Sequence, residues 1–180
     1  MPLAARSDDD LILLARGGVD LAFDTLVRRY QAAVLRVAAR YVGTPALAPD
    51  VAQNAFLEIY RALPRYQPLG RFNAYLYRVV LNQCRMAYRS ARIEAQALGR
   101  IADEAAQGTG AEVEGSLGSS GDVDRAVAGL SEKLRSAIML RYIAELDYAE
   151  IAETLDIPVG TAKRRVFDAL KVLHDRMVSS

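Results

Sequence analysis

The chain has 180 residues, of which 52% are hydrophobic, and its formal net charge is +1. This composition can fill one large core or two small ones, and it excludes an intrinsically disordered chain. With a single cysteine, Cys84, and a single histidine, His174, it also excludes a disulfide framework and a four-ligand zinc site built from these two residue types. We interpret Cys84 as a helix-packing thiol. The chain has no segment with the apolar length of a membrane span and no start typical of a signal peptide, so we expect a soluble, cytoplasmic protein without membrane insertion.

Four helices are predicted in the first part of the chain. Apolar residues recur at helical spacing in four segments, which are residues 8–16, 23–42, 51–63 and 71–92. Gly17-Gly18, Gly43 and Pro64 end the first three segments. Four such helices are enough for one compact bundle, so residues 1–92 are predicted to form an all-α domain.

Residues 93–122 differ in composition from what precedes them. They contain half of the 12 glycines of the chain, and their six acids face one base, Arg100. This composition predicts a flexible acidic linker, which can begin as a helix. The linker divides the chain into two small helical domains.

The second domain, residues 123–180, is predicted to hold about four helices and to end in a helix-turn-helix. Ser131 is a predicted N-cap, and Asp147 with Glu150 three residues later forms an aspartate version of the capping box. Residues 147–155 and the helix from Val159 onward match the motif whose second helix enters the major groove of DNA. An ordinary helical hairpin with a charged exterior is the alternative. The predicted DNA-facing residues of the last helix are Thr161, Lys163, Arg164, Arg165, Phe167, Asp168 and Lys171.

A row of basic residues follows the fourth helix of the first domain. Between Ile59 and Ile93 there are seven arginines and no acid. Steps of three and four place one set of residues on a single helix face: Arg71, Tyr75, Arg78, Asn82, Arg85, Arg89 and Arg92. A helix face that carries only positive charges, without compensating acids, is destabilised by repulsion between them. Its predicted partner is therefore a phosphate backbone. The interleaved aromatic residues are predicted either to hold unstacked bases or to belong to the core.

Several sequence blocks occur in a characteristic order. They read AFDTLVRRY at 22–30, DVAQNAFL at 50–57, FNAYLYRVVLN at 72–82, DYAEIAE at 147–153 and IPVGTAKRR at 157–165. Together with residues 8–15, 130–131 and 140–142, they resemble the extracytoplasmic-function sigma factors, the minimal promoter-recognition subunits of bacterial RNA polymerase. Each block is moderately specific, and their order and spacing are highly specific. The resemblance covers nearly everything except the linker.

The resemblance implies roles for three parts of the chain. The helix that carries Asp50, Gln53, Asn54 and Leu57 would dock on the clamp helices of core RNA polymerase. The last helix would read the −35 promoter element as duplex DNA. The loop of residues 65–72 and the helix after it would open and read the −10 element, through Arg65, Tyr66, Arg71, Tyr75, Arg78, Asn82, Arg85, Arg89 and Arg92.

The resemblance also implies an anti-sigma factor as a partner, and it implies no catalytic residue, cofactor, metal or small-molecule substrate. Five residues depart from the family pattern. Asn54 stands where an acid is usual and Tyr75 where tryptophan is common. Ser131 replaces a frequent proline, Arg164 stands where serine is usual, and Asp168 stands where a basic residue is common. Asp168 is expected either to accept a hydrogen bond from cytosine or adenine, or to pair with Arg164 or Lys171 along the helix.

Two other classes of protein remain open. A free-standing helix-turn-helix regulator that never binds polymerase would explain the second domain. It leaves the helix of residues 50–57 and the basic face without a use. A helical adaptor that mimics a sigma factor and binds only proteins is the other class, and the basic face argues against it.

Overall fold

The computed structural model describes residues 2–106 and 126–178. Within these ranges every regular element is a helix, which confirms the all-α prediction. The first domain contains the α-helices α1 (Asp8–Arg16), α2 (Asp20–Val42), α3 (Ala48–Ala62) and α4 (Phe72–Ala106), and the short 3-10 helices η1 (Leu3–Ala5) and η2 (Pro45–Leu47). The second contains α6 (Glu132–Tyr142), α7 (Tyr148–Leu155) and α8 (Val159–Val178). None of these helices is long and apolar enough to cross a membrane.

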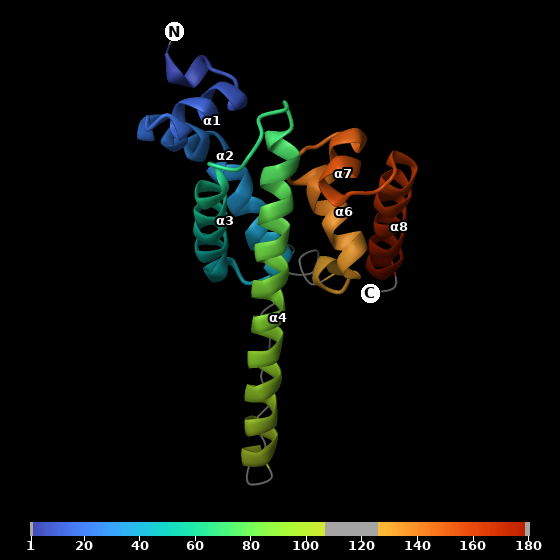
Figure 1. Ribbon diagram of the computed structural model, residues 1–180. Helices are drawn as coiled ribbons and strands as arrows, with labels where there is room; N and C mark the ends of the chain where they lie inside the picture. Colours follow the sequence, from blue (N-terminus) through green and yellow to red (C-terminus); the bar gives the residue numbers. More distant parts are fainter. Residues whose placement is uncertain (1, 107–125, 179–180) are drawn as a thin grey trace.

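The first domain is a bundle of α1, α2, α3 and the first half of α4 (Figure 1). Gly43 ends α2 as predicted, because its backbone at φ 74° is left-handed and its N–H donates to the carbonyl of Ala39. Cys84 is fully buried, and burial raises the pKa of its thiol to about 12. This buried thiol packs between helices, as the sequence predicted. The other fully buried core side chains include Leu11, Ile12, Leu26, Val34, Val37, Ile59, Leu76 and Val80.

Helix α4 extends beyond the predicted domain boundary. It runs to Ala106, so the boundary placed after residue 92 falls inside a continuous helix, whose last turns project away from the bundle (Figure 1). The alanine-rich residues 93–106 contain no proline, and their single glycine, Gly99, is too weak a breaker to end a helix. The rest of the predicted flexible linker, from residue 107, falls on residues 107–125, outside the described residues.

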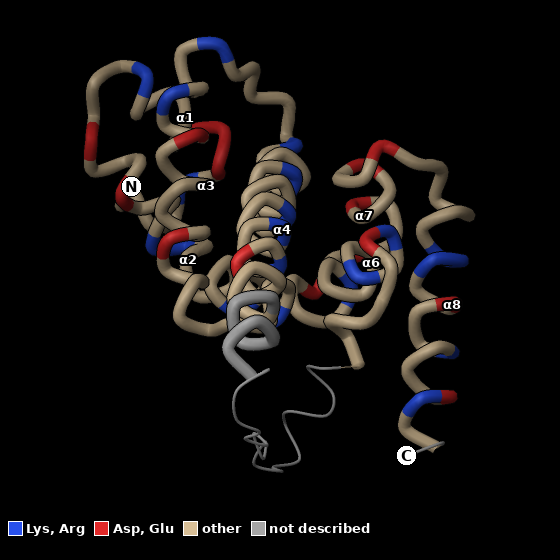
Figure 2. The backbone as a smooth tube through the Cα atoms, turned by 90° about the horizontal axis from the view of Figure 1, so that it is seen from below, with Lys and Arg blue, Asp and Glu red and all other residues tan. Residues whose placement is uncertain are grey.

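The second domain contains the predicted helix-turn-helix. The capping box at the start of α7 is present, since the Asp147 carboxylate accepts from the Glu150 N–H and the Glu150 carboxylate accepts from the Asp147 N–H, both at 2.8 Å. Asp156, in the left-handed region at φ 53°, makes the turn into α8. Ser131 occupies the N-cap position of α6, but its side chain accepts no capping hydrogen bond. Helix α7 packs against α4 and helix α6 packs against α2, so the second domain lies along one side of the bundle (Figure 1, Figure 2).

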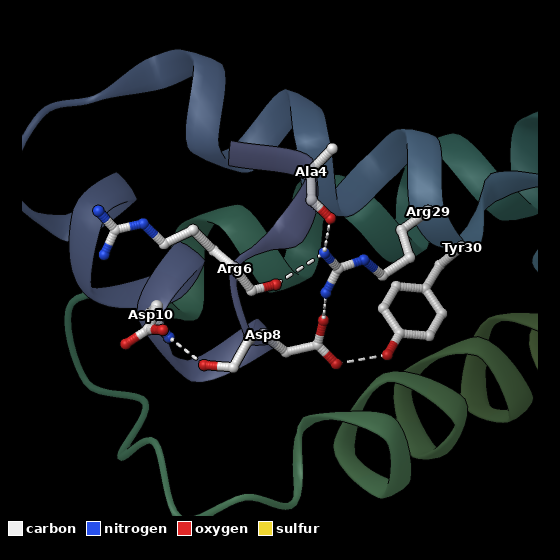
Figure 3. A network of polar contacts seen from close by, with 7 residues as sticks. Ala4, Arg6, Asp8, Asp10, Arg29 and Tyr30 are labelled. Atoms are coloured by element: carbon white, nitrogen blue, oxygen red, sulfur yellow. Dashed lines mark hydrogen bonds and ion pairs between the residues drawn. The ribbon is translucent and has the colours of Figure 1, made fainter. Parts of the chain in front are cut away.

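A polar network joins the N-terminal segment to α2 (Figure 3). Arg29 pairs with the carboxylate of Asp8 at the start of α1. The same guanidinium donates to the backbone carbonyls of Ala4, at 3.1 Å, and Arg6, at 2.9 Å. The hydroxyl of Tyr30 donates to the second oxygen of Asp8. Because Arg29 and Tyr30 lie on α2, this network fixes the first turn of α1 on that helix.

The anchored first turn of α1 also holds the loop between α3 and α4. The Asp9 carboxylate accepts a hydrogen bond from the backbone N–H of Gly70 at 2.7 Å. Gly70 has a φ of 70°, a backbone angle that residues other than glycine rarely adopt. Arg16, at the end of α1, donates to the carbonyl of Tyr66 at 3.3 Å. The start of α1 therefore positions the loop that leads into α4.

We predict that Asp9→Ala releases this loop. The substitution removes a charged acceptor from the Gly70 N–H, so hydrogen exchange of that amide should become about tenfold faster or more. Asp10→Ala is the matched control, because Asp10 is an exposed neighbouring acid whose side chain has no contact with the loop. Hydrogen exchange followed by NMR measures both, and equal protection of Gly70 in the two variants would contradict the assignment.

Candidate functional site

The predicted basic face of α4 is a single face in the structure, and it lies against the second domain. In Figure 2 the basic positions of α4 run along the side of the helix next to α6 and α7. At its first end, the Arg71 Nε pairs with the Glu153 carboxylate at 3.2 Å. Arg78 donates to the backbone carbonyls of Glu153, at 2.8 Å, and Thr154, at 3.2 Å. These carbonyls belong to the last turn of α7, the negative end of that helix.

Further along α4, one carboxylate of the second domain binds two arginines. The Oε1 of Glu132 lies 2.9 Å from the Nε of Arg85, and its Oε2 lies 3.2 Å from the Nη2 of Arg89. Glu132 is the first residue of α6. Arg85 also donates to the side-chain oxygen of Asn82 at 2.9 Å and lies 3.4 Å from the Ser136 hydroxyl. Four of the predicted DNA-binding arginines are therefore in contact with the second domain.

This arrangement corrects one premise of the sequence analysis. The basic face has no compensating acid within its own stretch of chain, but in three dimensions Glu132 and Glu153 compensate it. Arg65, in the loop before α4, and Arg92, at the far end of the row, are exposed and make no described contact with the second domain. The Arg92 guanidinium instead lies 5.8 Å from the centre of the Tyr88 ring.

The aromatic residues near the start of α4 divide into two groups. Phe72 and Tyr77 are buried, with 3% and 2% of their surface exposed, so these two belong to the core. Tyr66 and Tyr75 are half-buried, and their ring centres lie 4.8 Å apart. Burial, together with the nearby Asp9 carboxylate, raises the pKa of Tyr66 to about 12, so its hydroxyl stays neutral at physiological pH. The Tyr66–Tyr75 pair is the aromatic surface left at this end of the basic face.

The sequence analysis missed the residue at the centre of the contact between the domains. Arg135 of α6 is only 4% exposed, and its guanidinium lies 4.0 Å from the ring centre of Tyr88 and 5.2 Å from that of Tyr41. It also donates to the carbonyls of Ala128 and Leu130. No described contact of Arg135 is with a carboxylate. The sequence showed only that Arg135 lies between residues of the buried face of a predicted helix. That observation does not identify the aromatic rings of Tyr41 and Tyr88 as its partners.

The predicted recognition helix, α8, is accessible. It lies on the side of the second domain away from α4 (Figure 1), and Phe167 is 66% exposed. Of the other predicted residues, Lys163, Arg164 and Lys171 are exposed, whereas Thr161, Arg165 and Asp168 are half-buried. The Nε of Arg164 lies 3.7 Å from the Asp168 carboxylate, four residues further along the helix. This is one of the two arrangements expected for Asp168.

The predicted polymerase-docking residues form one exposed face of α3. Asp50, Gln53, Asn54 and Leu57 are all exposed, at the spacing of one helix face. Gln53 and Leu57 also line an apolar groove of about 470 Å³ between α2 and α3. Its remaining lining residues, which the sequence analysis missed, include Phe23, Val27, Leu35, Phe56 and Tyr60. Predicting that these residues line one groove would have required knowing how α2 and α3 pack. From the sequence alone, only the exposed position of Leu57 on α3 was predictable.

Comparisons with known proteins agree with this geometry. The Sigma-70 region 2 family model matches residues 26–93, and the Sigma-70 region 4 model matches residues 120–173. The chain is 34% identical to the ECF RNA polymerase sigma-E factor of Escherichia coli, over 95% of this chain and 94% of that protein. It is 30% identical to the RNA polymerase sigma-H factor of Pseudomonas aeruginosa, with the same coverage of both chains.

Solved structures show the same fold. CnrH, solved in complex with the cytosolic domain of CnrY, matches with a TM-score of 0.73 and 26% identity over 96% of this chain and 98% of that one. The sigma factor RpoE of Bartonella quintana, solved with the anti-sigma factor NepR, matches with a TM-score of 0.61 and 20% identity over 86% of this chain and 96% of that one. The chain therefore belongs to the extracytoplasmic-function sigma factors of the sigma-70 family, the non-enzymatic initiation factors that direct RNA polymerase to promoters.

Proposed function

We propose that α3 docks on core RNA polymerase in the cytoplasm, that α4 and the loop before it bind the −10 element, and that α8 binds the −35 element. The observation that carries this proposal is the row of arginines along one face of α4, with the Tyr66–Tyr75 pair at its start. Arginine is suited to phosphate, and aromatic rings are suited to unpaired bases. The free-standing regulator and the adaptor that binds only proteins both lose support, because both domains match a family that directs RNA polymerase to promoters.

The α3 surface supports polymerase docking by its chemistry. An exposed apolar side chain, Leu57, stands beside an apolar groove, and the polar side chains of Asp50 and Asn54 share its face. This is the pattern of a surface that packs against a partner helix, with an apolar anchor and a polar rim. The Asn54 amide keeps a hydrogen-bonding group where the family usually has an acid, without the negative charge.

We predict that Leu57→Asp weakens binding to core polymerase by about tenfold or more, because it places a charge at the apolar anchor. Leu98→Asp is the control, since Leu98 is also an exposed helical leucine but lies on the projecting part of α4. Affinity for purified core polymerase, with circular dichroism to check folding, measures the effect. Equal affinities of the two folded variants would remove α3 from the docking surface.

We predict that Arg78→Ala and Arg85→Ala together weaken the promoter complex of the holoenzyme and flatten its salt dependence. Each phosphate contact contributes roughly 0.7–0.9 to the slope of log affinity against log salt concentration, so the slope should fall by about 1.5. Arg28→Ala, an exposed arginine of α2, is the control. An unchanged slope and unchanged transcription in the double variant would exclude this face from DNA binding.

The Arg164–Asp168 pair leads to a prediction about the −35 element. The Asp168 carboxylate lies 3.7 Å from Arg164 in the free protein, and we propose that it keeps this partner on DNA instead of reading a base. Asp168→Arg should therefore raise affinity for all sequences through its charge and leave the preferred −35 sequence unchanged. Selection from a randomised −35 library with both proteins tests this. A shift towards guanine at one position would instead show that Asp168 reads a base in the wild-type protein.

An anti-sigma factor is the further partner that we propose. The solved relative CnrH was captured with the cytosolic domain of CnrY. In the present chain, the exposed α3 face with its groove is a surface at which a protein ligand would compete with polymerase. Such a ligand would keep the factor inactive by occupying the docking surface.

A further inference from the structure

A cavity of about 610 Å³ lies where the second domain meets α2 and α4. Tyr41 of α2, Tyr88 and three arginines of α4 form one side of it, and the segment that leads into α6 forms the other. We propose that this cavity binds a small molecule that carries a di- or triphosphate group. The proposal does not depend on the role of α4 in DNA binding, although α4 supplies arginines to both.

The lining of the cavity carries more positive than negative charge. Four arginines line it, Arg85, Arg89, Arg92 and Arg135, and Glu132 is the single acid among its lining residues. The Glu132 carboxylate is already shared by Arg85 and Arg89. Arg92 and Arg135 make no described contact with a carboxylate. Because like charges in a partly enclosed space repel one another, an anion in the cavity would lower the electrostatic energy.

The two arginines without an acid lie against the same aromatic ring. The Arg135 guanidinium is 4.0 Å and the Arg92 guanidinium 5.8 Å from the ring centre of Tyr88. Arg135 is only 4% exposed, and its Nη2 donates to the carbonyls of Ala128 and Leu130, whereas its Nε is buried without a hydrogen-bond partner. A buried donor without an acceptor costs free energy. The Arg135 guanidinium therefore has hydrogen-bonding capacity left for a further acceptor in the cavity.

The start of α6 adds backbone donors to the same cavity. Ser131 and Glu132 line it, and Ser131 is the exposed N-cap residue whose side chain makes no capping hydrogen bond. The first N–H groups of a helix have no acceptor within the helix, and the helix dipole places partial positive charge there. These properties make a helix start suitable for binding phosphate. The helix start and the arginines therefore favour the same class of ligand.

A phosphate chain matches these donors in geometry, charge and size. A guanidinium group donates two parallel N–H bonds to phosphate oxygens, and a di- or triphosphate has enough charge for both arginines that lack an acid. The volume of about 610 Å³ lies within the range of small-molecule sites, roughly 300–1,000 Å³. Such a volume accommodates an inorganic phosphate chain or one attached to a nucleoside. The phosphate chain is the chemistry that both ligands share.

Isothermal titration calorimetry on the full-length protein in about 150 mM salt tests the proposal, with inorganic pyrophosphate and ATP as probes. We expect one molecule bound per chain. Arg92→Ala should weaken binding by about tenfold, because it removes a charge-assisted hydrogen bond. Arg65→Ala is the matched control, since Arg65 is also an exposed arginine without a described contact to the second domain, but it does not line the cavity. Equal losses in the two variants, or no binding of either probe, would overturn the proposal.

The two probes also identify which part of the ligand the cavity recognises. Equal affinities for pyrophosphate and ATP support a site for the phosphate chain alone, and tighter binding of ATP supports a nucleotide site. Adenosine is the control without phosphate. Adenosine that binds as tightly as ATP would overturn the proposal, because the phosphate chain would then contribute nothing.

NMR locates the bound anion without replacing Arg135, whose burial makes substitution a risk to folding. The Nε–H signals of individual arginine side chains are followed while pyrophosphate is added to the wild-type protein. We expect the signals of Arg92 and Arg135 to shift and that of Arg65 to stay in place. An unchanged Arg135 signal would place the anion outside the cavity and overturn the proposal.

Discussion

Arg135 is an ionised side chain buried against two aromatic rings of the other domain, and α6 packs on the first domain around this contact. A guanidinium cannot lose its charge by deprotonation, so burial imposes a desolvation penalty. The rings of Tyr41 and Tyr88 and two backbone carbonyls offset that penalty. The Nε of Arg135 is buried without a hydrogen-bond partner, so this compensation is incomplete.

Local features of the fold were predictable from sequence because their causes are local. The capping box of Asp147 and Glu150 depends on residues three apart, and Gly43 ends α2 through its own backbone conformation. The predicted end of α4, near Arg92, was wrong because residues 93–106 contain no strong helix breaker. Their composition is compatible with both a linker and a helix. Helix formation there follows from continuity with the preceding turns, which stabilises each added residue.

The candidate site was predictable on each helix but not between helices. The arginine row, the α3 face and the exposed positions of α8 follow from helical periodicity alone. The pairing of Glu132 with Arg85 and Arg89 joins residues more than forty positions apart, and no local pattern encodes it. The groove beside Leu57 was missed for the same reason, since its other wall belongs to α2. The family resemblance implied roles for the arginine row, the α3 face and α8, but it contained no information on which of these surfaces contact other parts of the chain.

The length of α4 affects the effective concentration of one domain near the other. At 1.5 Å per residue, the part of α4 after Arg92 carries the chain about 20 Å beyond the turns that contact the second domain. The covalent connection to the second domain therefore leaves α4 far from the contact between the two domains. A tether anchored at a distance provides a lower effective concentration of one domain near the other than a short connection would. Lengthening or shortening this projecting helix would change that effective concentration without altering any residue of the contact between the two domains.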